Sequence, residues 1–156
     1  MVDTEFTEKC MKARTITIPP TVAAISRGEL AKSLAEQHQN NSEYFIEGAK
    51  NLVNSNTPLL VILVGYFAME HKAHQLLALK GYKIESHICI QMALSRIVER
   101  KDLARKLSEM FESRQNVGYR MFLQNNEEGK RLADKIMKEE IIPFLEEIDK
   151  LIQEAK

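Results

Sequence analysis

The sequence has no tryptophan, only 6 glycines and 4 prolines, and no apolar run long enough to cross a bilayer. Its longest apolar stretch, LLVILVGYFAM at residues 59–69, falls short of the roughly 20 residues that a transmembrane helix needs. The opening segment, MVDTEFTEKCMKAR, scatters charges where a signal peptide would have an apolar core. We therefore expect a soluble, cytoplasmic protein that has no membrane partner.

The chain also has few cysteines and no excess of either charge sign. The 2 cysteines, Cys10 and Cys89, form no Cys-x-x-Cys or zinc-type spacing, so the sequence implies no disulfide framework, and a reducing compartment fits it best. Lys plus Arg and Asp plus Glu each number 22, so no global positive field attracts the chain to nucleic acid. Any site for a polyanion must therefore be local.

Helical periodicity is what the chain does contain, and strand signals are nearly absent. Residues 1–28, which include TITIPP, are predicted to form an extended N-terminal arm, and residues 29–156 a single helical domain. The expected fold is all-α, an up-and-down bundle of four to five helices. Its last helix is expected to be long and bent at Pro143, because proline cannot donate a helical hydrogen bond.

Capping residues mark the expected helix boundaries. Thr57 and Pro58 are typical of a helix start, and the helix that follows is apolar on all sides, which predicts a central position. Gly81 is suited to the cap at its end, and Ser86 to the start of the next helix. A fourth helix is expected from about Lys101 to Gly118. A capping box of Asn125 and Glu128 indicates the start of the last one.

Arg114 interrupts an apolar stripe on that fourth helix. Spacings of three and four residues place it on one face with Leu103, Leu107, Met110, Val117 and Met121. Removing a guanidinium from water is costly unless a partner answers it. Arg114 therefore either pairs with a carboxylate of a neighbouring helix, or binds an anionic ligand, in which case Asn116, Tyr119 and Arg120 would extend the site.

Histidines provide a second group of candidates. Glu70, His71 and His74 lie within about one helical turn, a spacing that zinc ligands can use. A catalytic zinc site, however, needs a third protein ligand in register, and the sequence here is not H-E-x-x-H. A polar helix face is the simpler interpretation, and we predict no metal. By spacing alone, His87 is interpreted as a loop residue before the third helix.

Motifs for other enzyme classes are not found. The sequence has no phosphate-binding G-x-x-x-x-G-K-[ST], no G-x-G-x-x-G after a strand, and no nucleophile elbow. Basic residues between Arg96 and Lys106 alternate with Glu99 and Asp102 and lack interleaved aromatics, which indicates a solvated face. We predict no cofactor.

Two stretches carry a family resemblance: GYFAMEHKAHQLLALKGYKIESH at 65–87 and DLARKLSEMFESRQNVGYR at 102–120. Together they resemble the HEPN superfamily, specifically its small single-domain prokaryotic branch, over about residues 29–153. The resemblance implies a helical bundle that pairs into a dimer, with a cleft between the subunits at the end of the fourth helix. In active members, this helix carries an Arg and a His with four to six other residues between them, and the pair cuts RNA without a metal.

Only half of that motif is present here. Arg114 matches the Arg, but Tyr119 stands where the His is expected, and no His follows it. Tyrosine, with a reference pKa near ~10, is poorly suited to moving protons at neutral pH. The leading hypothesis is therefore a degenerate active site in a dimeric nucleotide- or RNA-binding or partner module. By resemblance it would act beside a nucleotidyltransferase in a toxin–antitoxin or defence system.

Two other functions stay open. The chain is a metal-independent endoribonuclease if Tyr119 or His87 supplies the missing proton transfer next to Arg114. Alternatively, the protein is a purely structural homodimer in which Arg114 pairs with Glu70 or Glu112 of the other chain.

Overall fold

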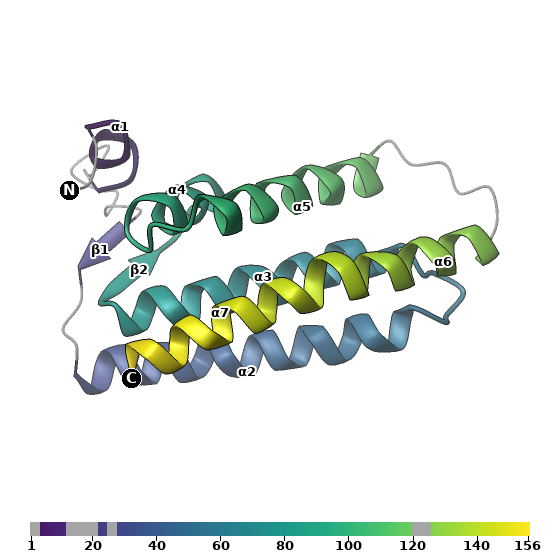
Figure 1. The fold of residues 1–156 in the computed structure, drawn as a ribbon, viewed down its shortest axis with the longest axis horizontal. Helices are drawn as coiled ribbons and strands as arrows, with labels where there is room; N and C mark the ends of the chain where they lie inside the picture. The colour runs from purple at the N-terminus through teal and green to yellow at the C-terminus, as the bar shows by residue number, and fades with distance from the viewer. Residues whose placement is uncertain (1–3, 12–21, 25–27, 120–125) are drawn as a thin grey trace.

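The computed structural model describes residues 4–11, 22–24, 28–119 and 126–156. The fold is an all-α bundle, as the sequence predicts (Figure 1). Its main helices are α2 (Glu29–Leu52), α3 (Leu60–Leu79), α4 (His87–Arg96), α5 (Lys101–Tyr119), α6 (Asn126–Ile136) and α7 (Ile142–Ala155). The smaller elements are α1 (Thr4–Phe6), a π-helical turn η1 (Thr7–Met11), strands β1 (Val22–Ala24) and β2 (Tyr82–Ile84), and a second π-helical turn, η2 (Met137–Ile141).

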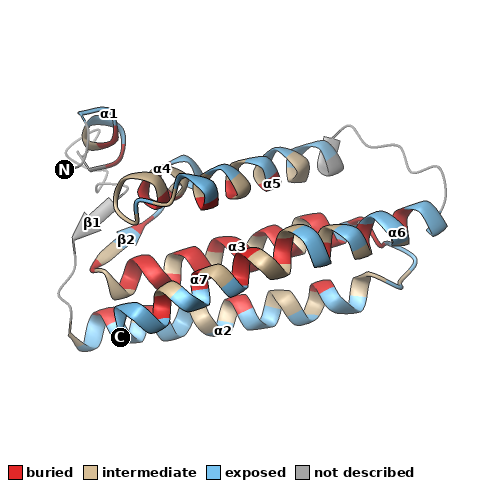
Figure 2. Ribbon diagram, viewed as in Figure 1, coloured by how far each residue is buried: buried red, intermediate tan, exposed pale blue. Residues whose placement is uncertain are grey.

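The apolar helix α3 lies at the centre of the bundle, as predicted, and packs against α2, α5 and α7. It is the most deeply buried helix (Figure 2), and its core side chains include Val61, Ile62, Met69, Leu76 and Leu77. Burying a side chain of this size contributes about 1.5–3 kcal/mol relative to leaving it exposed. No helix within the described ranges is both long and apolar enough to cross a membrane.

Of the three predicted helix caps that lie in the described residues, two are confirmed. Gly81 has a φ of 93° at the end of α3, where a side chain would be strained. The Ser86 hydroxyl accepts a hydrogen bond from the Cys89 amide at 3.4 Å and caps α4. The predicted cap at Thr57 is wrong, because α3 begins only at Leu60. Thr57 and Pro58 instead form a tight turn, in which the Thr57 carbonyl accepts from the Leu60 amide at 3.1 Å.

The last helix runs without a break through α6, η2 and α7. The irregularity expected at Pro143 takes the form of the π-helical turn that precedes it, because proline offers no amide hydrogen to the preceding turn. This turn packs closely on α3: a Cβ on Gly65 would lie 2.2 Å from Ile141 Cδ1. Asn125, the expected cap of this helix, lies outside the described residues.

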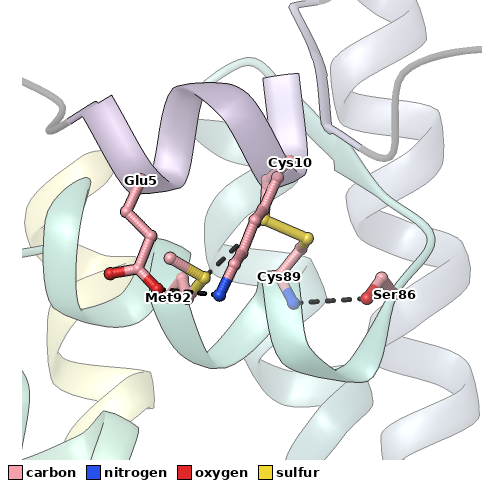
Figure 3. Close-up of a disulfide and its surroundings, with 6 residues drawn as sticks. Glu5, Cys10, Ser86, Cys89 and Met92 are labelled. Carbon is pink, nitrogen blue, oxygen red and sulfur yellow. Dashed lines mark hydrogen bonds and ion pairs between the residues drawn. A yellow bond between two sulfur atoms is a disulfide. The ribbon is translucent and has the colours of Figure 1, made fainter. Parts of the chain in front are cut away.

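The prediction of an extended arm is wrong for residues 4–11, which form α1 and η1 and attach to the bundle at α4. The side chains of Phe6 and Cys10 are fully buried, and a disulfide joins Cys10 to Cys89 (Figure 3). The sequence did not indicate this bond, because 79 residues separate the two cysteines and only the packing of η1 on α4 brings their Cα atoms to 5.6 Å. Strand β1 pairs with β2 in an antiparallel ladder, with Ala23 opposite Lys83. The stretch TITIPP lies outside the described residues.

Candidate functional site

The apolar stripe on α5 leads to Arg114, as predicted. Leu103, Leu107 and Met110 are buried in the core, and Arg114 is half-buried one turn beyond them. This helix position fixes the start of the arginine side chain, so its guanidinium loses little freedom when it binds a ligand. The side chain of Val117, and Met121 as a whole, lie outside the described residues.

Aromatic rings surround the guanidinium of Arg114. Its Cζ lies 4.8 Å from the ring centroid of Phe111, 5.1 Å from that of Tyr66 and 5.9 Å from that of Phe67. Such contacts stabilise a cation by about 0.5–2 kcal/mol. The enclosed Nε has no hydrogen-bond acceptor, and no described carboxylate lies within ion-pair distance of Arg114. The neighbouring-helix carboxylate that would make Arg114 a simple ion pair is therefore not found among the described residues.

Under Arg114 lies a hydrogen-bonded group of three side chains centred on Glu70. Tyr66 donates its hydroxyl hydrogen to Glu70 Oε2, one helical turn further along α3. His87 Nδ1, at the start of α4, lies 2.5 Å from the same oxygen and 3.1 Å from the Tyr66 hydroxyl. The predicted loop position of His87 is wrong, because Ser86 caps α4 and makes His87 its first residue.

These contacts fix the protonation of the group. Burial alone would raise the pKa of Glu70, but the nearby His74 imidazole and the hydrogen bonds with Tyr66 and His87 outweigh it and lower the pKa to about 2. Burial and the hydrogen bond to Glu70 raise the pKa of Tyr66, so its hydroxyl stays a donor. Because an ionised carboxylate can only accept, His87 Nδ1 is the donor to Glu70, and in the neutral imidazole Nε2 is then the acceptor.

Phe111 and Tyr66 connect His87 with Arg114. The His87 ring centroid lies 5.4 Å from that of Phe111 and 6.0 Å from that of Tyr66, and Arg114 lies over both of those rings. We refer to Tyr66, Glu70, His87, Phe111 and Arg114 as the Arg114 site. Helix α5 contributes the Arg114 guanidinium to this site, and α4 contributes His87, whose side chain is 44% exposed. Helix α3 contributes Tyr66 and Glu70, which lie beneath them.

The other three histidines form a separate group, the histidine cluster of His38, His71 and His74. The Nδ1 atoms of His38 and His71 are 2.9 Å apart, and the rings of His38 and His74 stack with centroids at 4.6 Å. Burial, then the neighbouring histidines, lower the pKa of His38 to about 3, and burial also lowers the pKa of His71.

A metal does not fit the histidine cluster. The rings of His38 and His74 lie 13° from parallel, and stacked rings do not direct their nitrogens toward one point. Among the residues that the structure describes, no group of three or more His, Cys, Asp or Glu is arranged to hold a metal ion. His71 and His74, the two candidate metal ligands of the sequence, therefore belong to a packing contact between α2 and α3.

The remaining predicted site residues do not join the described site. Asn116 is exposed on α5, the side chain of Tyr119 is not described, and Arg120 lies outside the described residues. Sequence reasoning missed Tyr66 and Phe111 as site residues. The four-residue spacing of Tyr66 and Glu70 on one helix face was a usable signal, whereas Phe111 gave none.

Comparisons with known proteins give a family. No curated protein and no solved structure matches the chain. A model of the HEPN domain matches residues 35–155, a range that contains the whole Arg114 site and confirms the resemblance seen in the sequence. The match supports a nucleotide- or RNA-related module in the broad sense. Because it spans more than half of the sequence, the chain belongs to the HEPN domain family.

Proposed function

We propose that the Arg114 site binds a phosphate group of a nucleotide or of RNA. The observation that carries this proposal is a fixed guanidinium with an enclosed, unpaired Nε and no described carboxylate partner. A guanidinium offers a planar fork of donors that matches phosphate oxygens. Aromatic rings on its faces hold it in place without neutralising its charge, so the charge remains available to a ligand.

The site also limits what else Arg114 can do. Glu70, one candidate partner for Arg114 across a dimer interface, already accepts hydrogen bonds from Tyr66 and His87 of its own chain. An ion pair with Arg114 of a second chain would compete with those bonds. This favours ligand binding over a purely structural role for Arg114.

RNA binding by fluorescence anisotropy tests this function. We expect the wild-type protein to bind a labelled mixed-sequence RNA, and Arg114→Ala to lose at least about tenfold in affinity, as for a charge-assisted contact of about 1.5–3 kcal/mol. Arg105→Ala is the matched control, because Arg105 is an exposed arginine on the same helix. Equal losses in both variants would show a general charge effect and contradict a specific site.

A second candidate function is metal-independent cleavage of RNA, favoured by the hydrogen bond between Glu70 and His87 Nδ1. In this reaction Nε2 of His87 accepts the proton of a ribose 2′-hydroxyl, and the 2′-oxygen attacks the adjacent phosphorus. The 5′-oxygen leaves and takes a proton from water, while Arg114 stabilises the charge on the phosphate. His87 would thereby replace the motif histidine that Tyr119 does not supply.

We further propose that the protein acts as a homodimer, with a nucleotidyltransferase as a candidate partner in a toxin–antitoxin or defence system. Support for the dimer comes from membership of the HEPN family, since the resemblance to that family implies pairing of two chains. Light scattering at micromolar concentration and co-purification with the candidate partner test the two parts separately.

A further inference from the structure

A strip of rings leads away from the Arg114 site across α3 to α2. Phe67 lies next to Arg114, and its ring centroid is 5.3 Å from that of Phe45 on α2. Phe45 in turn stacks on His71 at 5.6 Å, with the two rings 10° from parallel. All three rings, Phe45, Phe67 and His71, are half-buried, so part of the surface of each residue stays exposed.

A groove begins at Phe45. It has a volume of about 820 Å³ and is lined by α2 and α3, chiefly through Tyr44, Phe45, Gly48, Val64, Asn40 and Asn51. Tyr44 is 76% exposed and meets Phe45 edge-on at 5.6 Å. Gly48 lines the groove without a side chain: a Cβ there would make ordinary contact with Val64 at 3.5 Å, and a longer side chain would occupy part of the groove.

We infer that this groove receives an unpaired base of single-stranded RNA, stacked on the exposed ring of Tyr44 and edge-on to Phe45, while a phosphate of the same strand contacts Arg114. The inference rests on the proposed function and adds the substrate class and the base subsite. Unpaired bases stack on aromatic rings in RNA-binding proteins, and duplex bases cannot leave their stack to do so. Only the ring of Phe67 separates Phe45 from Arg114.

The charges of the groove set the orientation of the strand. Glu43, which accepts a hydrogen bond from Gln39, and Glu47, which pairs with Lys50 at 3.0 Å, both line it. The residues that line the groove therefore offer phosphate no unpaired cation, and Arg114 does. The carboxylate oxygens of Glu43 and Glu47 can instead accept hydrogen bonds from the amino group of a base, and Asn40 and Asn51 offer amides to base edges. An amino-bearing base such as adenine therefore fits better than uracil.

Anisotropy with two probes tests the inference: a short labelled oligoadenylate, and an abasic sugar–phosphate strand of equal length. We expect the oligoadenylate to bind at least about tenfold more tightly, since stacking contributes about 1–3 kcal/mol per base. Tyr44→Leu and Phe45→Leu should remove most of that difference and leave the abasic strand unaffected. Tyr82→Leu is the aromatic control, because Tyr82 lies on β2 outside the groove.

A groove-filling variant protects the test against misfolding. Gly48→Met leaves every ring in place and should weaken oligoadenylate binding by a similar factor, with circular dichroism and thermal melting confirming that each variant is folded. Equal binding of both probes, dependent on Arg114, would overturn the base subsite and leave the phosphate site intact. Binding of neither probe would overturn the proposed function together with this inference.

Discussion

The four histidines of the chain divide between two regions that meet at Glu70. On one side, His87 is held by a carboxylate, is partly exposed, and lies in the same ring cluster as Arg114. On the other side, His38 and His71 contact each other, and His38 stacks on His74. Glu70 contacts both regions, because its second oxygen lies 3.9 Å from His74 Nε2.

The two regions differ in the groups that contact the imidazole rings. A carboxylate at one nitrogen keeps the hydrogen there and prepares the other nitrogen to accept a proton. Burial among other imidazoles disfavours the charged form and turns histidine into a packing residue. The same residue type is therefore suited to chemistry at His87 and to joining α2 with α3 at His38.

The largest expected effect comes from replacing His87, which tests whether the two histidine regions differ in function. Under the second candidate function, a cleavage assay on an RNA pool in EDTA should show a loss of at least about a hundredfold for His87→Ala relative to wild type, as for a general base. His38→Gln should stay within a few-fold of wild type, because His38 touches neither Arg114 nor His87. Equal losses in the two variants would remove the distinction between the regions.

Removing the disulfide tests how firmly α4 is held beside the site. Cys89 follows His87 by two residues on α4, and its bond to Cys10 closes a long loop. We expect Cys10→Ser to lower the free energy of unfolding in urea by about 2–4 kcal/mol. The wild-type protein should lose a similar amount in reductant, and the variant should lose no more there. An unchanged unfolding midpoint in both would contradict a stabilising bond.

Glu70 itself connects the two regions, and a double-mutant cycle measures one of its contacts. Glu70→Gln should lower the free energy of unfolding by about 1–3 kcal/mol, because buried partners lose a charged acceptor. Tyr66→Phe removes only the hydroxyl that donates to Glu70 and keeps the ring under Arg114. Since the two residues contact each other, the double variant should lose less than the sum of the single losses. Strict additivity would show that the hydrogen bond contributes nothing.

The smallest expected effect is on the pH dependence of the free energy of unfolding, which should differ between the two regions. His38 has a pKa of about 3 in the folded protein and 6.5 as a reference, so the unfolded chain binds more protons between those values. Stability should therefore fall as the pH falls below 6.5, because the unfolded chain takes up a proton that His38 of the folded protein does not.

Glu70 contributes over a different range. Its pKa of about 2 lies below the reference of 4.5, so its stabilisation is fully present above pH 4.5 and is lost below it. Urea unfolding at several pH values should show a first loss, between 6.5 and 4.5, that His38→Gln reduces and Glu70→Gln does not. The opposite pattern would contradict the neutral state of the histidine cluster.

Much of the fold could be predicted from the sequence, because periodicity and capping report local structure. The central position of α3, the caps at Gly81 and Ser86, and the buried stripe before Arg114 all follow from short-range patterns. The disulfide could not be predicted in this way, since it depends on how the N-terminal segment packs on α4.

The candidate site was predictable only in part. Arg114 stood out as a charge in an apolar stripe, and the structure places it in the ring cluster that also includes His87. The link between them runs through Tyr66 and Phe111, which lie on different helices and whose meeting depends on tertiary packing. For the same reason, the pairing of His38 with His71 could not be read from their spacing.

Nuclear magnetic resonance of the histidine rings, recorded during a titration with inorganic phosphate, tests the central claim most directly. The account predicts that the ring signals of His87 move and that those of His38, His71 and His74 stay in place. The movement should disappear in Arg114→Ala. A His87 signal that does not respond, or that responds equally without Arg114, would contradict a phosphate site shared by these two residues.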